Sequence, residues 1–189
     1  MIKNIVFDIG RVLIGFEWND YILSLFDEET ADKVTGAMWG TGYWKQLDIA
    51  LLTDEEILEL FYSAAPEYKD QILEAFERVG ECVKRRDWAI PLIKDLKEKG
   101  YRVLYLSNFS EHVMGSNRDA LDFVPHMDGG VFSCDINVIK PAAGIYTALL
   151  EKYSLLPEEC LFIDDHRDNV SAAKKCGMKG IVFENRQRS

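Results

Sequence analysis

Three short apolar runs, each followed at once by a polar side chain, limit the folds open to this chain. They are Ile5-Val6-Phe7 before Asp8, Val103-Leu104-Tyr105-Leu106 before Ser107, and Leu161-Phe162-Ile163 before Asp164. Such runs are typical of strands that are buried on both faces and belong in a parallel sheet covered by helices. A fourth run, Ile181-Val182-Phe183, predicts an edge strand.

Helical patterns lie between these runs. Apolar residues recur at helical spacing over 88–99, up to Gly100, and further helices are predicted over 144–153 and over 168–176, up to Gly177. A glycine in this position is a common helix stop. The alternation of strands and helices predicts an α/β fold with a doubly wound, Rossmann-like parallel sheet and right-handed crossovers.

The stretch 15–85 has a different character, because it is acidic and its apolar pattern predicts helices and no strand. Thr53 and Glu56 have the spacing of a capping box at a helix start. The predicted helices are 18–27, 29–38, 54–63 and 68–84. We therefore predict a core domain of residues 1–14 and 86–189, with a small helical cap at 15–85 inserted after the first strand and lying over the crevice.

The charge balance favours some classes of partner over others. The 189 residues carry a formal net charge of −10, so neither a nucleic acid nor an anionic membrane surface is the expected partner. No apolar stretch approaches the ~20 residues of a membrane span, and the first apolar run is too short for a signal peptide. The four cysteines are widely spaced and form no C-x-x-C pair, which favours a reducing, cytoplasmic location over a zinc site or a redox dithiol. The sequence does not indicate an oligomeric state.

Polar residues that follow parallel strands meet at the crevice where doubly wound folds bind ligands. Asp8, Ser107-Asn108 and Asp164-Asp165 are expected there, and Lys140 can reach the same crevice from its Lys-Pro step. Taken singly, each has a plainer interpretation as a helix cap, a turn or a surface lysine. Taken together, the carboxylates would repel one another unless a hard cation such as Mg²⁺ joins them. The same cation and Lys140 would neutralise the charge of a transferring phosphoryl group.

Four segments, in order along nearly the whole chain, resemble the motifs of the haloacid-dehalogenase-like hydrolases. The segments are Phe7-Asp8-Ile9-Gly10-Arg11-Val12-Leu13, Leu106-Ser107-Asn108, Lys140-Pro141 with Ile145-Tyr146, and Phe162-Ile163-Asp164-Asp165-His166-Arg167-Asp168-Asn169. The resemblance implies a magnesium-dependent phosphatase whose helical cap selects the substrate and excludes water.

The resemblance also implies a role for each of the acidic residues. Asp8 is implied as the nucleophile that forms an aspartyl-phosphate. Mg²⁺ is implied to bind Asp8, the backbone carbonyl of Gly10 and Asp165, with Asp164 close by or bridging through water. Asn169 is implied to orient the metal-binding loop.

Three further residues are implied to bind the phosphoryl oxygens: Ser107, the Asn108 amide and Lys140. The first motif is similar to that of a bacterial branch that includes α-D-glucose-1-phosphate phosphatase. The expected partner is therefore a small phosphorylated metabolite such as a sugar phosphate.

One position departs from the family pattern. The usual first motif has a second aspartate two residues after the nucleophile, which serves as general acid and base; here that residue is Gly10. Its carbonyl can still bind a metal, but proton transfer worth about 10²–10⁴-fold in rate is lost. Three replacements are open: a metal-bound water, a cap residue, or a leaving group that needs little help. His166 is either a replacement base or an exposed histidine at a helix start.

Other residues have two open interpretations. Trp18, Tyr43, Trp44 and Lys45 contact the substrate or pack within the cap, and Arg11 contacts the substrate or forms a surface salt bridge. For the whole protein, two alternatives to a phosphatase stay open. One is a non-catalytic or weakly active phosphate-binding regulator, which Gly10 favours. The other is a metal-independent haloacid dehalogenase, which would have no use for the acid pair Asp164-Asp165.

Overall fold

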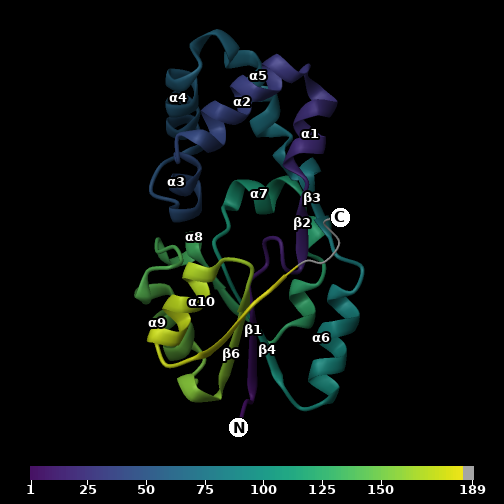
Figure 1. Cartoon of the computed structure of the whole chain (residues 1–189), viewed down its shortest axis with the longest axis vertical. Coiled ribbons are helices and arrows are strands. Elements are labelled where there is room, and N and C mark those ends of the chain that lie inside the picture. The colour runs from purple at the N-terminus through teal and green to yellow at the C-terminus, as the bar shows by residue number, and fades with distance from the viewer. Residues whose placement is uncertain (185–189) are drawn as a thin grey trace.

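The computed structural model describes residues 1–184 and is built on a five-stranded parallel sheet in the order β5-β4-β1-β6-β7 (Figure 1). The strands are Asn4–Phe7 (β1), Arg102–Ser107 (β4), Gly130–Phe132 (β5), Cys160–Asp164 (β6) and Lys179–Val182 (β7). The three predicted central runs are thus neighbours in the sheet, and the fourth run forms its predicted edge. The α/β fold with a doubly wound parallel sheet is confirmed.

The side chains of β1 divide between two buried clusters, one on each face of the sheet. Ile5 and Phe7 face one cluster and Val6 faces the other, as the two-residue period of a strand requires. Complete burial of such side chains stabilises the fold by about 1.5–3 kcal/mol each. This two-sided burial explains why the run before Asp8 is apolar without alternation.

Helices of the core cover both faces of the sheet. Ala89–Glu98 (α6) packs on one face, and Ala143–Lys152 (α9) and Arg167–Lys175 (α10) pack on the other, while Glu111–Ser116 (α7) and Ser133–Ile136 (α8) follow the carboxyl ends of β4 and β5. The three predicted core helices are confirmed to within one residue. Gly100 and Gly177 follow two of them with φ of 86° and 88°, in the left-handed region that favours glycine.

A second group of helices lies beyond the carboxyl edge of the sheet, at the top of Figure 1. We call these the cap helices: Trp18–Leu25 (α1), Glu28–Thr35 (α2), Trp44–Ile49 (α3), Asp54–Ala64 (α4) and Lys69–Glu77 (α5), with a π-helical turn at Gly36–Gly40. The capping box at the start of α4 is present, since Thr53 Oγ1 accepts from the Glu56 amide and Glu56 Oε2 accepts from the Thr53 amide. The prediction of one helix over 68–84 was too long, and α3 was not predicted.

The expectation of no strand within 15–85 was wrong. Ile14–Phe16 (β2) and Val83–Arg85 (β3) pair as a two-stranded antiparallel ribbon where the chain enters and leaves the cap helices. Three residues are too few to display an alternating pattern, and each strand exists because of its partner far along the sequence. The ribbon lies at the boundaries proposed for the cap, and residues 185–189 of the proposed core lie outside the described residues.

Polar contacts hold the cap helices to the core. His112 of α7 lies between Asp54 Oδ2 at the start of α4 and the carbonyl oxygen of Phe76 in α5, each 2.8 Å from a ring nitrogen. Its ring also stacks on that of Phe76, with centroids 3.8 Å apart. A second contact between core and cap joins α8 to α3, where Ser133 Oγ donates to the carbonyl oxygen of Asp48 at 2.6 Å.

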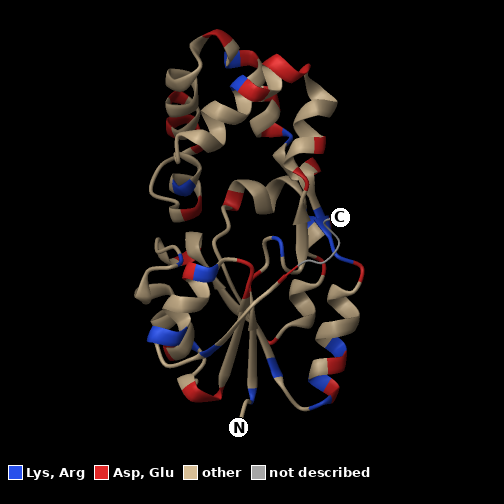
Figure 2. Ribbon diagram, viewed as in Figure 1, with Lys and Arg blue, Asp and Glu red and all other residues tan. Residues whose placement is uncertain are grey.

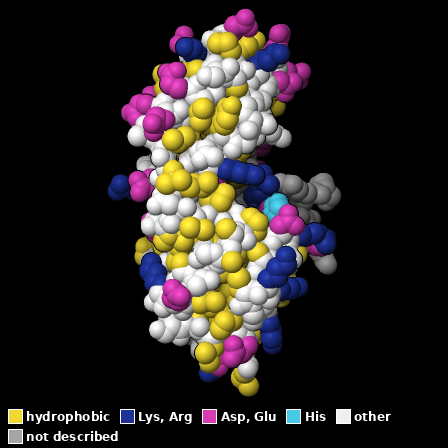
Figure 3. All heavy atoms as spheres, turned by 90° about the vertical axis from the view of Figure 1, so that its left-hand side faces the viewer, with side chains coloured by type: hydrophobic (Ala, Val, Ile, Leu, Met, Phe, Trp, Pro, Cys, Tyr) yellow, Lys and Arg dark blue, Asp and Glu magenta, His cyan; other side chains and the backbone are white. Residues whose placement is uncertain are grey.

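Asp and Glu residues are numerous along the cap helices (Figure 2), and the face in Figure 3 shows acidic side chains there together with scattered hydrophobic side chains. Within residues 1–184, no helix combines the length and the apolar character that crossing a membrane requires.

Candidate active site

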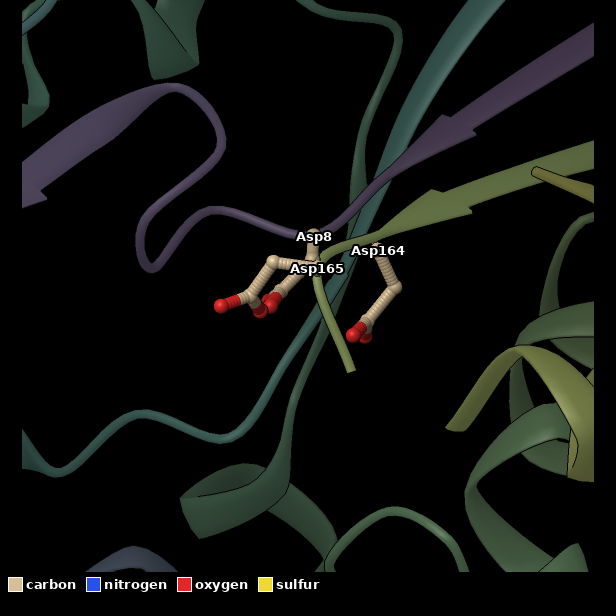
Figure 4. A group of neighbouring side chains, drawn as sticks. All are labelled: Asp8, Asp164 and Asp165. Atoms are coloured by element: carbon tan, nitrogen blue, oxygen red, sulfur yellow. The ribbon is translucent and has the colours of Figure 1, made fainter. Parts of the chain in front are cut away.

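Three carboxylates meet at the carboxyl ends of β1 and β6. Asp8, Asp164 and Asp165 each offer an oxygen, and these oxygens all lie within 4.8 Å of one another. Figure 4 shows the three side chains extending to the same side from the ends of the two strands. Asp8 and Asp164 are buried and Asp165 is partly buried. The polar residues after the central strands are thus brought together as predicted.

One oxygen of Asp8 carries most of the hydrogen bonds to that side chain. Oδ1 accepts from the Ile9 amide at 2.7 Å, from Ser107 Oγ at 2.8 Å and from Lys140 Nζ at 2.8 Å. Within residues 1–184, no protein donor forms a hydrogen bond with Oδ2. Burial raises the pKa of Asp8 to about 6, although the charge of Lys140 acts in the opposite direction.

Lys140 joins the two buried carboxylates. Its ammonium group lies 2.8 Å from Asp8 Oδ1 and 2.7 Å from Asp164 Oδ2, and its side chain is 1% exposed. Burial acts to lower the pKa of Lys140, but the two carboxylates outweigh it and hold that pKa above its ordinary value. One buried cation therefore offsets part of the negative charge, and the cluster keeps an excess of carboxylates.

Asn169 of α10 holds Asp164 from the other side. Its Nδ2 donates to both carboxylate oxygens of Asp164, at 3.1 and 3.0 Å, and the His166 amide donates to Oδ1 at 2.7 Å. Asp164 is thereby saturated with donors, while burial and the charge of Asp164 raise the pKa of Asp165. The side chain of Asp165 forms no hydrogen bond or ion pair within the described part of the chain, so its carboxylate is free to bind a ligand.

Asn108 and Lys140 fix the two loops against each other. Asn108 Nδ2 donates to the Lys140 carbonyl at 3.1 Å, and Asn108 Oδ1 accepts from the Lys140 amide at 2.7 Å. The side chain of Asn108 thus positions Lys140, and it is the backbone amide of Asn108 that remains for an incoming anion. Ser107 is fully buried and donates to Asp8.

Comparison with known proteins agrees with this geometry. The family model of the haloacid dehalogenase-like hydrolases matches residues 2–177. The chain belongs to this family of hydrolases. The match spans all four predicted motifs, from Asp8 to Asn169, so the predicted membership is confirmed.

Two relatives of this chain are phosphatases by name. D-ribitol-5-phosphate phosphatase of Bacteroides thetaiotaomicron is 25% identical over 98% of this chain and 93% of its own length. A sesquiterpene phosphatase of Aspergillus oryzae is 23% identical over 95% of this chain and 88% of its own length. A solved structure of a family enzyme from Bacteroides thetaiotaomicron, in complex with magnesium and inorganic phosphate, has a TM-score of 0.74 at 20% identity and covers 99% of this chain and 96% of its own. These comparisons support a phosphatase with the fold of this hydrolase family.

This hydrolase has a cleft beside its acidic cluster. The cleft has a volume of about 290 Å³ and lies between the cap helices and the carboxyl edge of the sheet. Its lining is partly polar and partly aromatic: Gly10, Arg11, Ile14, Phe16, Trp39, Trp44, Asp48, Asn108, Phe109, Ser110, Val113, Asp165, His166 and Asn169. Position 10 has room, since a Cβ built on Gly10 meets no heavy atom within 4 Å.

The candidate substrate contacts divide between the cleft and the cap interior. Trp44 lines the cleft and stacks on Trp39, with ring centroids 4.0 Å apart. Trp18 is buried, donates to Thr35 Oγ1 at 2.9 Å and lines a neighbouring cleft. Tyr43 and Lys45, as far as the chain is described, line neither cleft.

The two basic candidates near the acidic cluster both line the cleft. Arg11 adopts φ of 58°, a strained conformation for a residue other than glycine, and forms no ion pair within residues 1–184, so the surface salt bridge is not present. His166 is exposed and begins α10, in keeping with its plainer interpretation.

The acidic cleft residue Asp48 was missed by sequence reasoning, whereas Trp39 belongs to an aromatic segment, 39–44, that the sequence offered as a substrate-facing turn. Asp48 belongs to the unpredicted helix α3, and nothing in the local sequence distinguishes it from the surrounding acidic residues of the cap. Trp39 lines the cleft, and its buried Nε1 has no hydrogen-bond partner within the described residues. Only the fold brings these residues to the acidic cluster.

Proposed function

We propose that this hydrolase cleaves phosphate monoesters with Mg²⁺ through an aspartyl-phosphate intermediate on Asp8. The observation that carries the proposal is the asymmetry of the Asp8 carboxylate. Three donors fix Oδ1, including Lys140, while Oδ2 has none in the described structure. A nucleophile needs such a fixed orientation with an available lone pair.

The donor set fits a hard divalent cation. Carboxylate oxygens within 4.8 Å of one another, beside the backbone of Gly10, are the ligand type that Mg²⁺ prefers. We propose that Asp8, the Gly10 carbonyl and Asp165 hold the cation, with Asp164 close by and Asn169 orienting Asp164. When bound, the cation neutralises charge on the transferring phosphoryl group. The magnesium and phosphate complex of the related Bacteroides enzyme supports this proposal.

Three groups are proposed to bind the phosphoryl oxygens. Ser107 Oγ and Lys140 Nζ already meet at Asp8 Oδ1, so both donors lie beside the carboxylate of the proposed nucleophile. The backbone amide of Asn108 is the third, since its side chain is engaged with Lys140. Charge-assisted hydrogen bonds of this kind are the strong ones in phosphate recognition.

The substrate is proposed to be a small phosphorylated metabolite whose leaving group occupies the cleft under the cap. Relatives act on ribitol 5-phosphate and on sesquiterpene phosphates, so their names alone do not choose between a polar and an apolar leaving group. The cleft offers both an aromatic wall at Trp39 and Trp44 and polar groups at Asp48 and Arg11. A sugar phosphate remains our first candidate, and we retain the division into a core and a cap at 15–85 as part of the proposal.

The test is phosphate release from a panel of sugar, polyol, terpenoid and aryl phosphates, with Mg²⁺ and with a chelator. We expect release that requires Mg²⁺ and falls at least ~10³-fold in Asp8→Asn, which keeps the size of the side chain. Asp32→Asn, an exposed carboxylate on α2, is the matched control and should retain wild-type rates. Release that is undiminished in Asp8→Asn, or unchanged by the chelator, would contradict the mechanism.

A second candidate function follows from Gly10. Because no acid occupies that position, the protein is alternatively a phosphate-binding regulator without significant turnover. This alternative predicts that phosphate protects the protein against thermal unfolding in the presence of Mg²⁺, while no ester in the panel, including p-nitrophenyl phosphate, is hydrolysed by an Asp8-dependent reaction.

A further inference from the structure

The proposed reaction needs a proton on the ester oxygen of the leaving group. When the bond between phosphorus and the ester oxygen breaks, that oxygen leaves as an alkoxide unless an acid protonates it. Gly10 supplies no acid, yet it lines the cleft and leaves open space where a side chain would stand. A proton donor must therefore reach this part of the cleft from another element.

Asp48 is the acidic residue of the cap helices that lines that cleft. It belongs to the last turn of α3 and lines the same cleft as Gly10, Asn108 and Asp165. It is partly buried, and the described residues include no hydrogen bond or ion pair to its carboxyl oxygens. Among the described residues, the Asp48 carboxyl group thus has no hydrogen-bond or ion-pair partner that would hold it ionised.

The position of Asp48 is fixed by the core and not by the cap alone. Ser133 Oγ donates to its carbonyl oxygen at 2.6 Å, and Ser133 is itself buried. Asn137 Nδ2 donates to the next two carbonyls, those of Ile49 at 2.8 Å and Ala50 at 3.1 Å. The end of α3 is therefore tied to α8 and its C-cap residue by three hydrogen bonds, which fix the backbone that carries the Asp48 side chain at the cleft.

The other titratable groups of the cleft are less suited to this task. Asp165 belongs to the proposed metal site, and the guanidinium of Arg11 offers hydrogen-bond donors but no acceptor for the proton of the attacking water. His166 is exposed at the start of α10 and lies next to the metal pair in sequence. Lys140 is engaged with two carboxylates.

We propose that Asp48, supplied by the cap, is the general acid and base of this hydrolase, in place of the acid that Gly10 lacks. The inference rests on the proposed phosphatase function. In the first step, an Asp8 oxygen forms a bond to phosphorus, the phosphorus–oxygen ester bond breaks, and its electron pair stays on the ester oxygen. That oxygen takes the proton of Asp48, so an alcohol leaves and Asp48 becomes a carboxylate.

The second step returns both residues to their starting state. The Asp48 carboxylate takes a proton from the water molecule that attacks the phosphorus of the aspartyl-phosphate. The bond between phosphorus and the Asp8 oxygen breaks, and its electron pair restores the Asp8 carboxylate. Inorganic phosphate leaves, and Asp48 is protonated again.

The electrostatic environment of Asp48 supports this role. Burial raises the pKa of its carboxyl group to about 7, with the negative charge of Asp8 acting in the same direction and the charge of Lys140 against it. An acid–base group works best with a pKa near the working pH.

The test compares leaving groups in the full-length protein with Mg²⁺. For Asp48→Asn we expect kcat/KM to fall by ~10²-fold or more with alkyl phosphates, whose alkoxides need a proton, and by less than ~3-fold with p-nitrophenyl phosphate. Gly10→Asp added to Asp48→Asn should restore the alkyl phosphate rates at least in part, because position 10 has room for the side chain. Asp32→Asn on α2 is the matched control and should leave both rates unchanged.

The outcomes separate this inference from the proposed function. The role of Asp48 would be overturned if Asp48→Asn lost equal activity with both classes of ester, or lost none with either. It would also be overturned if the wild-type rate fell with increasing leaving-group basicity as steeply as the rate of the variant. The phosphatase function would survive any of these results provided that p-nitrophenyl phosphate hydrolysis still requires Asp8. Loss of that requirement would instead reject the proposed function.

Discussion

Lys140 Nζ lies 2.8 Å from Oδ1 of Asp8, in an ion pair that connects two loops far apart in the sequence. The same oxygen accepts from Ser107, so the side chain of Asp8 is held in one orientation with Oδ2 left available among the described contacts. This pairing does two things at once. It orients the proposed nucleophile, and it brings a positive charge to the position proposed for the phosphoryl oxygens.

Replacement of Lys140 should affect both stability and activity. Lys140→Met leaves Asp8 and Asp164 buried without their shared cation, so we expect the metal-free protein to lose about 3–5 kcal/mol of unfolding free energy. The loss should shrink when Mg²⁺ is added, since a bound cation offsets the same charges, while phosphate release stays below detection. Lys175→Met, at an exposed position of α10, should change the stability by less than ~0.5 kcal/mol. Equal urea midpoints for the two variants would contradict the role assigned to the pair.

Asn169 should control the affinity for the metal more than the chemical step. Because its Nδ2 donates to both oxygens of Asp164, Asn169→Ala frees that carboxylate to rotate. We expect the Mg²⁺ concentration for half-maximal activity to rise ~10–100-fold, with a smaller change in the rate at saturating Mg²⁺. Asp168→Ala, an exposed neighbour on the same helix, should leave the Mg²⁺ dependence unchanged. A variant with wild-type Mg²⁺ dependence would remove Asn169 from the metal site.

The stability of the metal-free protein should depend on pH in a defined direction. The pKa values of Asp8 and Asp48 are raised to about 6 and about 7, so the folded protein binds these protons more tightly than the unfolded chain. Their contribution to stability is therefore complete below about pH 4 and is lost as the pH rises through 6 and 7. Thermal unfolding with a chelator should show this fall, and Mg²⁺ should reverse it at neutral pH by neutralising the cluster.

Asp48→Asn provides the control for that pH dependence. The amide does not ionise, so the variant should lose the part of the fall that lies near pH 7 while keeping the part due to Asp8. A metal-free protein whose unfolding temperature rises between pH 5 and pH 8 would show that the two carboxyl groups are not raised as described.

Trp39 should contribute to binding and not to stability. Its buried Nε1 finds no acceptor in the described structure, and a buried donor left without one costs about 1–3 kcal/mol. A ligand in the cleft that accepts from Nε1 would recover this energy, so Trp39→Phe should raise KM ~10-fold for such a substrate with little change in kcat. Its unfolding temperature should be equal to or above that of the wild type. A variant that is destabilised while KM is unchanged would show that Trp39 serves only to pack the cap.

The sequence predicted the sheet well because the signals there are local. The central strands are apolar on both sides, so the runs before Asp8, Ser107 and Asp164 mark both their extent and their ends. The edge strand β5 was missed, because it has three residues and begins with Gly130, whose backbone packs against the ring of Tyr105. The β2–β3 ribbon was missed for the related reason that pairing over a long separation leaves no local pattern.

The site could be predicted only in its core half. Motif residues at strand ends are fixed by the parallel sheet, so the meeting of Asp8, Lys140 and the acid pair follows from the fold class. The cap half depends on where the end of α3 lies against α8, which Ser133 and Asn137 determine through tertiary hydrogen bonds. No feature of the sequence around Asp48 predicts that this residue lines the cleft.

The most direct test of the account is to detect the covalent intermediate on Asp8. The wild-type protein is mixed with p-nitrophenyl phosphate and Mg²⁺, quenched in acid within milliseconds, digested, and analysed by mass spectrometry. We predict a phosphoryl group on Asp8 that disappears when a chelator is present and is absent from Asp8→Asn. Rapid release of p-nitrophenol without a label on Asp8, or a label on another residue, would contradict the assignment of Asp8 as the nucleophile.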